Sequence, residues 1–162
     1  MTKQIPLNDG QIAVIDDEDY DLVAQFEWRV AYRRKTRYAA RWVGSPGGTG
    51  TTELMHRLIA QPSPDVQIDH IDGDGLNNTR GNLRPATQTQ NRRNRGKTSA
   101  NKSGYKGVRW HTKARKWFAA IGIGDGRYKH LGLFIDPADA ARAYDRAACE
   151  YFGEFANTNF PR

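Results

Sequence analysis

The sequence has almost no cysteine and no long hydrophobic run. Cys149 is the only cysteine among 162 residues, which excludes an internal disulfide and a zinc site built from four cysteines. The first ten residues lack the apolar core of a signal peptide, and no apolar stretch approaches the length of a membrane span. These absences predict an intracellular, cytoplasmic protein without a membrane partner.

Acidic residues are absent from the middle of the chain. Residues 75–124 contain no Asp or Glu but carry twelve Lys and Arg, whereas the whole chain has a net charge of +7. The remainder of the chain is therefore net acidic. Such an uneven distribution favours an anionic partner, with nucleic acid as the first candidate. A solvated basic face is the alternative.

One short polar stretch, IDHIDGDGLNNTRGNLR (68–84), combines a histidine with several Asp and Asn. Three interpretations compete: a polar surface turn, a calcium loop, and a site where a metal and a proton acceptor work together. Placing Asp72 and Asp74 at the third and fifth positions of an EF-hand loop puts His70 at the first position. An EF-hand needs Asp there and Glu at the twelfth position, where Gly81 stands, so the calcium loop is excluded.

The surface turn and the metal site remain as alternatives. A surface turn does not explain the adjacent pair of Asp69 and His70, or the later Asn82 and Asn91. In a metal site, the Asp69 carboxylate and the Asn91 amide oxygen are ligands that a hard ion accepts; this sparse shell suits Mg²⁺, with Mn²⁺ as the alternative. His70, largely neutral at cellular pH, would accept a proton from the attacking water. Asn82 would orient the hairpin or the imidazole ring.

The pattern around this stretch predicts two strands and a helix. Val66 and Ile68 alternate with polar neighbours as in a half-buried strand, and Leu83 lies in a second short run. Thr87 is a suitable helix N-cap, and Gln90 stands at the capping-box spacing. The hairpin, its loop and the helix N-terminus are therefore expected to converge.

The stretch IDHIDGDGLNNTRGNLRPATQTQNRRNR closely resembles the HNH endonucleases, in the branch of phage and intron homing enzymes. Their fold is a ββα-metal (His-Me) finger, in which two strands and a helix hold one divalent ion. The resemblance covers residues 53–95. It implies catalytic roles for His70 as general base and Asn82 as the middle asparagine, with Asp69 and Asn91 as metal ligands. The third motif position is Asn rather than His, a variant usual in the homing branch.

The C-terminal part predicts a three-stranded antiparallel sheet packed on one helix. The runs YKGVRWH, KWFAAIGI and RYKHLGLF are strand-like, and GDG is a strong hairpin turn. For the helix, Asp136 is a suitable N-cap, Pro137 fits the first helical position, and Gly153 suits the C-terminal end.

Strand alternation predicts an apolar face toward the helix and a cationic, aromatic face toward DNA. The apolar face contains Val108, Trp110, Trp117, Ala119, Ile121, Leu131 and Leu133. The opposite face contains Arg109, His111, Lys116, Phe118, Tyr128 and His130. Lys106 and the basic residues Arg92, Arg93, Arg95 and Lys97 complete the predicted DNA-binding set. A sheet of this kind can enter the major groove, where Arg reads guanine.

The same part of the chain resembles the DNA-binding domain of plant APETALA and ethylene-response factors. The segments YKGVR, LGLF, AARAYD and TNFP carry the resemblance, over residues 103–161. In the plant domain, Arg and Trp side chains of the sheet contact bases and phosphates. This sequence has His111, Ala120, Gly122 and His130 where plant members have Arg, Glu, Arg and Trp. The resemblance therefore implies DNA binding but not the plant recognition sequence.

Together these patterns predict an α+β protein with a nuclease half and a DNA-binding half. We expect an HNH nuclease domain with a β-rich N-terminal extension (1–95), a basic linker (96–103) and an APETALA-type domain (104–162). The expected activity is that of a monomeric, site-directed homing-type endonuclease that nicks double-stranded DNA with one divalent metal and a His general base. A small-molecule substrate is not expected. The alternative is a non-catalytic, sequence-specific DNA-binding regulator.

Overall fold

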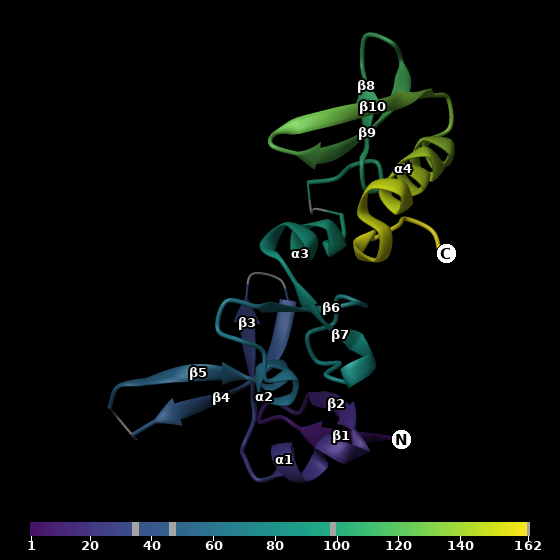
Figure 1. Ribbon diagram of the computed structural model, residues 1–162. Coiled ribbons are helices and arrows are strands. Elements are labelled where there is room, and N and C mark those ends of the chain that lie inside the picture. The colour runs from purple at the N-terminus through teal and green to yellow at the C-terminus, as the bar shows by residue number, and fades with distance from the viewer. Residues whose placement is uncertain (34–35, 46–47, 98–99, 162) are drawn as a thin grey trace. The chain divides into compact units, whose positions relative to one another are not determined.

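The chain folds into two compact units, as a computed structural model shows (Figure 1). The described residues are 1–33, 36–45, 48–97 and 100–161. The first unit is Met1–Gln88 and the second is Thr89–Arg162. The chain contains small antiparallel sheets and few helices, which confirms the predicted α+β class. None of the described helices has the length and apolar character needed to cross a membrane.

The first unit holds three small sheets within its described residues, with strand orders β1-β2, β3-β4-β5 and β6-β7. Its strands are β1 (Thr2–Pro6), β2 (Ile12–Asp16), β3 (Arg29–Arg33), β4 (Thr36–Gly44), β5 (Gly50–Leu54), β6 (Gln67–His70) and β7 (Leu83–Ala86). Its helices are η1 (Asp17–Asp19), α1 (Tyr20–Ala24), α2 (Met55–Ala60) and η2 (Arg80–Asn82). The β6-β7 pair is the hairpin predicted around the polar stretch.

The core of the first unit joins the N-terminal strands to the loop between β6 and β7. Leu76, from that loop, packs in one buried cluster with Ile15 of β2 and Met55 of α2. The backbone N–H of Val14 donates to the Leu76 carbonyl at 2.9 Å, and the Asn78 N–H donates to the Val14 carbonyl at 2.7 Å. The loop therefore extends the N-terminal sheet and has a fixed conformation.

Gly75 brings the same loop directly against β4. A Cβ added at Gly75 would lie 2.6 Å from the Tyr38 ring and would also collide with the Arg37 carbonyl oxygen. Only glycine allows this approach, because any side chain would overlap with backbone atoms that cannot move cheaply. The contact positions Tyr38 beside the loop.

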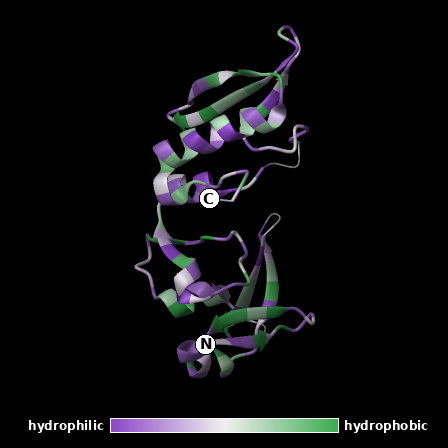
Figure 2. Ribbon diagram, turned by 90° about the vertical axis from the view of Figure 1, so that its right-hand side faces the viewer, coloured by the Kyte–Doolittle hydropathy of each residue, from purple (hydrophilic) through white to green (hydrophobic). Residues whose placement is uncertain are grey.

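The second unit is a three-stranded antiparallel sheet covered by one long helix, as predicted. Its elements are α3 (Gln88–Asn94, whose first residue belongs to the first unit), β8 (Val108–His111), β9 (Lys116–Gly124), β10 (Arg127–Phe134), α4 (Pro137–Phe152) and η3 (Gly153–Phe155). The Asp136 carboxylate caps α4 by accepting from the Ala138 N–H at 2.7 Å, and Gly153 ends the helix with a φ of +54°. Hydrophilic and hydrophobic residues alternate along α4 (Figure 2).

The face of this sheet toward α4 is mostly the one that alternation predicts. Val108, Ala119 and Ile121 are buried, and Leu131 packs against both clusters that the helix forms with the sheet. The prediction was wrong for Trp110 and Leu133, which are 49% and 40% exposed, while Phe134 packs toward the helix. The β9-β10 register shifts between His130 and Gly132, so the alternation of β10 reverses there.

The segment predicted as a basic linker ends in a bonded turn. Residues 98 and 99 of that segment lie outside the described residues. The Ser103 hydroxyl lies 2.8 Å from the Val108 carbonyl and 2.9 Å from the Asn101 amide oxygen. The Asn101 amide in turn donates to the Tyr105 carbonyl at 2.6 Å. These bonds fix the start of β8. The division into a nuclease domain (1–95), a linker (96–103) and a DNA-binding domain (104–162) stays a prediction.

Candidate active site and nucleic-acid surface

Asp69 and His70 are the last two residues of β6, opposite Arg84 and Leu83 of β7. Both are 5% exposed. Adjacent residues of a strand point to opposite sides, so the hairpin presents the carboxylate on one face and the imidazole on the other. The two groups stand at the end of β6, where the polar loop begins, and the Asp69 charge acts on the His70 ring, where it opposes the lowering of the pKa by burial.

Asp69 forms a buried ion pair with Arg84. The Nε and Nη2 atoms of Arg84 lie 3.1 Å and 2.8 Å from Asp69 Oδ2, and both side chains are less than a tenth exposed. The guanidinium compensates a carboxylate that burial alone would make costly. The pair spans the hairpin and so also fixes the orientation of the Asp69 side chain.

The His70 ring faces the buried Asn78 side chain. His70 Nε2 lies 3.4 Å from Asn78 Oδ1, and the amide nitrogen of Asn78 donates to the Leu76 carbonyl at 3.1 Å. This second bond orients the amide so that its oxygen faces the ring, which favours the tautomer with the proton on Nε2. Burial lowers the pKa of His70, although Asn78 and the neighbouring aspartates Asp72, Asp69 and Asp74 raise it.

Two aromatic rings, from Tyr38 and His56, enclose the His70 imidazole. The His56 ring meets it edge-on at 4.8 Å between centroids, and Tyr38 lies 5.7 Å from both histidines. Burial lowers the pKa of His56 to about 3, with smaller contributions from the charges of His70, Arg57 and Arg33. His56 Nδ1 is buried without a hydrogen-bond partner in the described part of the chain. His56 is therefore a neutral packing residue.

Asn82, in η2, organises the loop. Its amide nitrogen donates to Asp72 Oδ1 at 2.9 Å and to the Asn77 carbonyl at 2.8 Å, while its oxygen accepts from the Asp72 N–H at 3.0 Å. The sequence left open whether Asn82 orients the hairpin or the imidazole, and these bonds all go to the hairpin loop. Asn78 is the residue whose side chain meets the imidazole.

The predicted metal ligands belong to different parts of the fold. Asp69, with His70 and Asn82, lies in the first unit; Asn91 is half-buried in α3, among the residues of the second unit. α3 begins two residues after β7 ends. A carboxylate and an amide oxygen form a hard donor set that fits a small divalent cation.

An acidic cluster in the first unit is not the predicted site. Asp16, Glu18 and Asp19 bring their carboxylates within 4.8 Å of one another. Arg80 binds all three residues: its side chain pairs with Asp19 at 2.7 Å and Glu18 at 3.1 Å, and its backbone N–H donates to Asp16 at 2.8 Å. The cluster therefore connects η1 to η2 through an arginine.

The outward face of the second unit's sheet carries a stack of rings and cations. The Phe118 ring lies nearly parallel to His130 at 4.6 Å and to His111 at 6.2 Å, and the Arg109 guanidinium lies 4.5 Å above it. His111 Nδ1 accepts from the Ala114 N–H at 3.1 Å, so its other nitrogen is the donor of the neutral ring. This surface offers donors and flat rings together, as proteins that bind nucleic acid do.

The remaining predicted DNA-binding residues differ in exposure. Arg92, Arg95, Lys97, Lys116 and Tyr128 are exposed, and Tyr128 is 77% exposed. Arg93 is half-buried, with its guanidinium 4.7 Å from the Phe152 ring. Lys106 Nζ donates to the Arg93 carbonyl at 2.7 Å, and burial lowers its pKa to about 8. These contacts give Lys106 a role within the second unit.

Comparison with known proteins follows the two halves of the chain. An uncharacterized HNH endonuclease of Acanthamoeba polyphaga mimivirus is 31% identical over 153 residues, which cover 93% of this chain and 75% of the viral protein. An ethylene-responsive transcription factor of Arabidopsis thaliana is 38% identical over 102 residues, 60% of this chain and 62% of that protein. An APETALA2-like protein of Oryza sativa subsp. indica is 48% identical over 59 residues, 36% of this chain and 13% of that protein. No protein-family model matches the chain.

A buried imidazole in a polar loop, in a chain that also has a sheet with cations and rings on its outward face, fits a protein that acts on nucleic acid. The similarity to the viral endonuclease extends over almost the whole chain, and the chain belongs to the HNH endonuclease family. Its C-terminal region is similar to APETALA2-like and ethylene-responsive transcription factors. The relationship to the HNH endonuclease indicates a nuclease, and the similarity of the C-terminal region to transcription factors indicates DNA binding.

Sequence reasoning missed Arg84 and Asn78, which hold the two central side chains. Arg84 stands one position after the hydrophobic Leu83, and correct strand pairing would have placed it opposite Asp69. No comparable signal exists for Asn78, because Val14, whose carbonyl accepts from the Asn78 N–H, lies more than sixty residues earlier in the chain.

Proposed function

We propose that the protein is a site-directed endonuclease that hydrolyses one phosphodiester bond of double-stranded DNA with a divalent metal and a His general base. In this proposal β6, β7 and α3 form a ββα-metal module, and the chain acts as a monomer that nicks one strand in the manner of a homing enzyme. The observation that carries the proposal is the His70 imidazole, buried next to Asp69 and oriented by Asn78.

His70 has the protonation state that a general base needs. A base must be neutral before it accepts a proton, and burial lowers the pKa of His70 from its ordinary value. With the proton on Nε2 beside Asn78 Oδ1, the lone pair is on Nδ1. In our proposal Nδ1 removes the proton from the attacking water.

Asp69 and Asn91 would hold the metal, with Mg²⁺ as the expected ion and Mn²⁺ as the alternative. When bound, the ion supplies positive charge next to the oxygen that leaves. Arg84 holds the Asp69 carboxylate in place, and Asn82 holds the loop that follows His70. Each of these side chains fixes the position of a group that acts, which is the requirement of a preorganised site.

The second unit would supply position and affinity. We propose that the outward sheet face, with Arg109, His111, Lys116, Phe118, Tyr128 and His130, enters the major groove of the target. The exposed basic residues Arg92, Arg95 and Lys97, which precede the sheet in the sequence, would contact phosphates. Arg93 and Lys106 would contribute mainly by attaching α3 to this unit, since both make contacts inside it.

The experiment that tests this function is incubation of supercoiled plasmid carrying candidate target sequences with the purified chain and Mg²⁺ or Mn²⁺. We expect conversion to the open-circular form, abolished by EDTA and by His70→Ala. Cys149→Ser, at an exposed residue outside the proposed site, serves as the matched control and should cut normally. Plasmid that stays closed with every metal and target would favour the alternative, a DNA-binding regulator without catalysis.

A further inference from the structure

One side of the β3-β4-β5 sheet borders the candidate active site. The register pairs Ala31 with Tyr38, so strand alternation puts Arg29 and Arg33 of β3 on the same side as Tyr38. The Tyr38 ring lies 5.7 Å from the His70 ring. The charge of Arg33 also contributes to the low pKa of His56, which is the ring edge-on to His70. The side of the sheet that carries Arg29, Arg33 and Tyr38 therefore lies next to the His70 imidazole.

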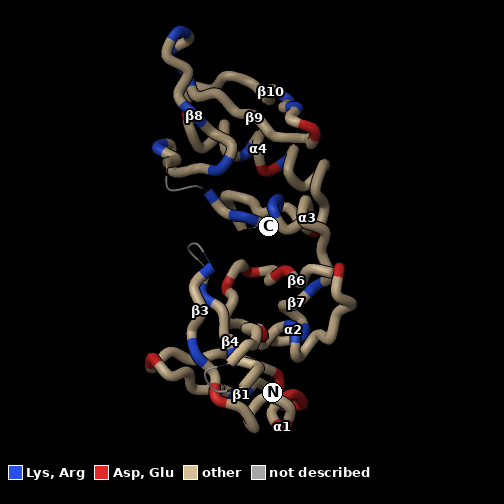
Figure 3. Tube along the Cα trace, turned by 90° about the vertical axis from the view of Figure 1, so that its left-hand side faces the viewer, with Lys and Arg blue, Asp and Glu red and all other residues tan. Residues whose placement is uncertain are grey.

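The cations on this side differ from those on the other side of the same sheet. Arg29 and Arg33 are exposed, and neither forms an ion pair within the described residues. On the other side, Arg37 donates to the Gln11 side-chain oxygen at 2.8 Å, and Arg41 pairs with Glu53 at 2.7 Å. Figure 3 shows the Lys and Arg positions along β3. Arg29 and Arg33 thus differ from Arg37 and Arg41 in that their side chains have no ion-pair or hydrogen-bond partner among the described residues.

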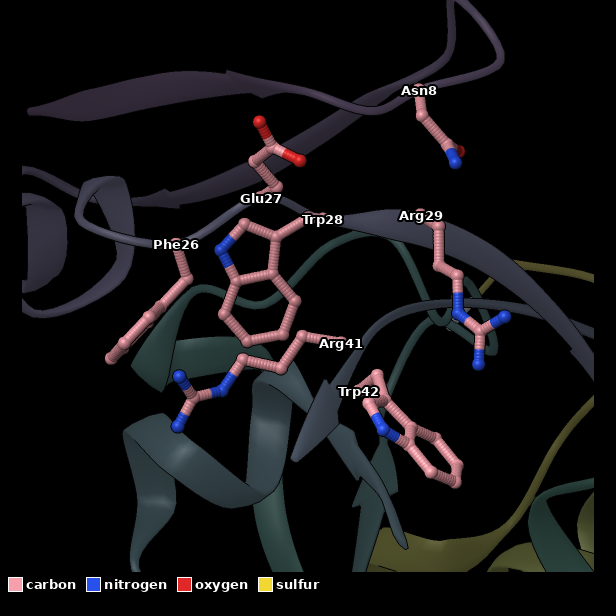
Figure 4. Close-up of a pocket in the computed structure, with 7 residues that line it drawn as sticks. All are labelled: Asn8, Phe26, Glu27, Trp28, Arg29, Arg41 and Trp42. Carbon is pink, nitrogen blue, oxygen red and sulfur yellow. The ribbon is translucent and has the colours of Figure 1, made fainter. Parts of the chain in front are cut away.

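Trp42 extends the same side away from His70. It is 49% exposed, and a Cβ added at Gly50 would lie 2.5 Å from its ring, so the indole lies against the backbone of β5. Trp42 and Arg29 both line a surface pocket at this end of the sheet (Figure 4). Glu53 is the only acidic residue of the three strands, and its pairing with Arg41 puts it on the other side.

We propose that this side, which we call the arginine face (Arg29, Arg33, Tyr38 and Trp42), is a second DNA-binding surface that holds the phosphate backbone next to the bond that is cut. The inference rests on the proposed endonuclease function and assigns a role to the N-terminal extension.

The chemistry of the arginine face fits a DNA backbone. Exposed Arg side chains without an ion-pair partner in the described part of the chain, beside an exposed indole and a half-buried phenol, suit a polyanion better than a protein surface of mixed charge. Glu27, which lines the pocket with Arg29 and Trp42, is the acidic residue at that end of the face. Arg29 and Arg33 are four residues apart, or roughly 13 Å at about 3.3 Å per residue, which corresponds to about four nucleotides of one strand at 3.4 Å each. Phosphate contacts of this kind set the register of a protein on DNA and carry no sequence preference.

The test measures the salt dependence of binding by the full chain to a fluorescein-labelled 30-base-pair duplex of arbitrary sequence. Binding is followed by fluorescence anisotropy in EDTA over a range of NaCl concentrations. The slope of log K against log salt decreases by about 0.9 for each lost phosphate contact. We expect the double variant Arg29→Gln/Arg33→Gln to lower the magnitude of this slope by about 1.8.

The matched control is Lys3→Gln/Arg37→Gln, which removes the same charge from the first unit at cations that have partners. This control is expected to keep the wild-type slope. An unchanged slope in the arginine-face variant, or an equal decrease in the control, overturns the inference. Arg33→Gln alone, with about half the effect, replaces the double variant if circular dichroism shows that the latter is unfolded.

Failure of the inference and failure of the proposed function give different results. Binding in EDTA requires no cleavage. If the chain never nicks plasmid but Arg29→Gln/Arg33→Gln lowers the magnitude of the salt slope, the arginine face binds DNA and the proposed endonuclease function is wrong. If the chain nicks plasmid but the same variant has the wild-type salt slope, the endonuclease function is supported and the arginine face is not a DNA-binding surface.

Discussion

Asn78 illustrates how one buried amide determines the state of a neighbouring ring. Its nitrogen is bound to the Leu76 carbonyl, so its oxygen is the atom that faces His70 Nε2. Rotation of the amide by half a turn would put its NH2 group against the protonated Nε2 of His70. It would also remove the hydrogen bond to the Leu76 carbonyl. The energetic preference for one orientation is therefore transmitted to the tautomer of the imidazole.

Replacement of Asn78 should slow cleavage without weakening DNA binding. Asn78→Ala removes the acceptor that fixes the His70 tautomer, and loss of such a supporting group typically reduces activity by about 10–100-fold. We expect this decrease in the single-turnover rate, with an unchanged Kd for DNA measured in EDTA. Asn78→Asp keeps an oxygen at the ring but loses the bond to the Leu76 carbonyl, so it should recover only part of the rate. Equal rates for Asn78→Ala and wild type would disprove the positioning role.

His56 should make the first unit sensitive to acid. Its pKa falls from 6.5 to about 3 in the folded chain, so between these values the unfolded chain binds a proton that the folded chain does not. The free energy of unfolding should therefore be highest above pH 6.5 and decrease on acidification, by up to about 1.4 kcal/mol per pH unit for this group. His70, whose pKa is also lowered, acts in the same direction.

Calorimetric scans of the full chain between pH 7 and pH 4 would measure this effect. His56→Phe removes the titrating group while keeping a ring against His70, and the transition of the first unit should then depend less on pH. His130→Phe, an exposed histidine of the second unit, should leave that transition unchanged. A steep acid dependence that survives in His56→Phe would mean that other groups cause it.

At the scale of elements, the loop between β6 and β7 depends on its contact with β4. Gly75→Ala should destabilise this contact, because the added methyl group overlaps the Tyr38 ring and the Arg37 carbonyl. Overpacking of this kind typically costs about 1–3 kcal/mol. Gly81→Ala is the matched control, because nothing lies within 4 Å of a Cβ at that position. Urea unfolding of both variants, beside the wild type, measures the difference.

Local signals in the sequence explain which elements could be predicted. The cap at Asp136, the stop at Gly153 and the alternation that buries Ala119 and Ile121 of β9 depend on a few neighbouring residues, and the structure has them. The reversal at Leu133 required knowledge of a register shift between strands, which no local pattern reveals. The Asn78 site depends on contact with β2, and such long-range pairing is equally hidden in a single sequence.

At the scale of the whole molecule, His70 and Asp69 of the proposed chemistry lie in the first unit, whereas the sheet proposed for target recognition lies in the second, as does the proposed ligand Asn91. Arg109→Ala should weaken binding to the target by about 1–3 kcal/mol, the range for one good base contact, and relax site preference. The cleavage rate of bound DNA should remain that of the wild type, since Arg109 stacks on Phe118 in the second unit. Band-shift titrations and single-turnover cleavage on the same duplex separate the two quantities; a slower rate with unchanged affinity would contradict this division.

The parallel bridge between Val14 and Asn77 has a consequence for protein engineering. A fragment cut down to residues 53–95, where the family motif lies, would lose the strand that supports Leu76 and Asn78. Transplanting the cutting activity onto another recognition module would therefore require the first fifty residues to travel with the motif. A shorter graft would carry the proposed catalytic residues but would leave their loop without the strand that supports it.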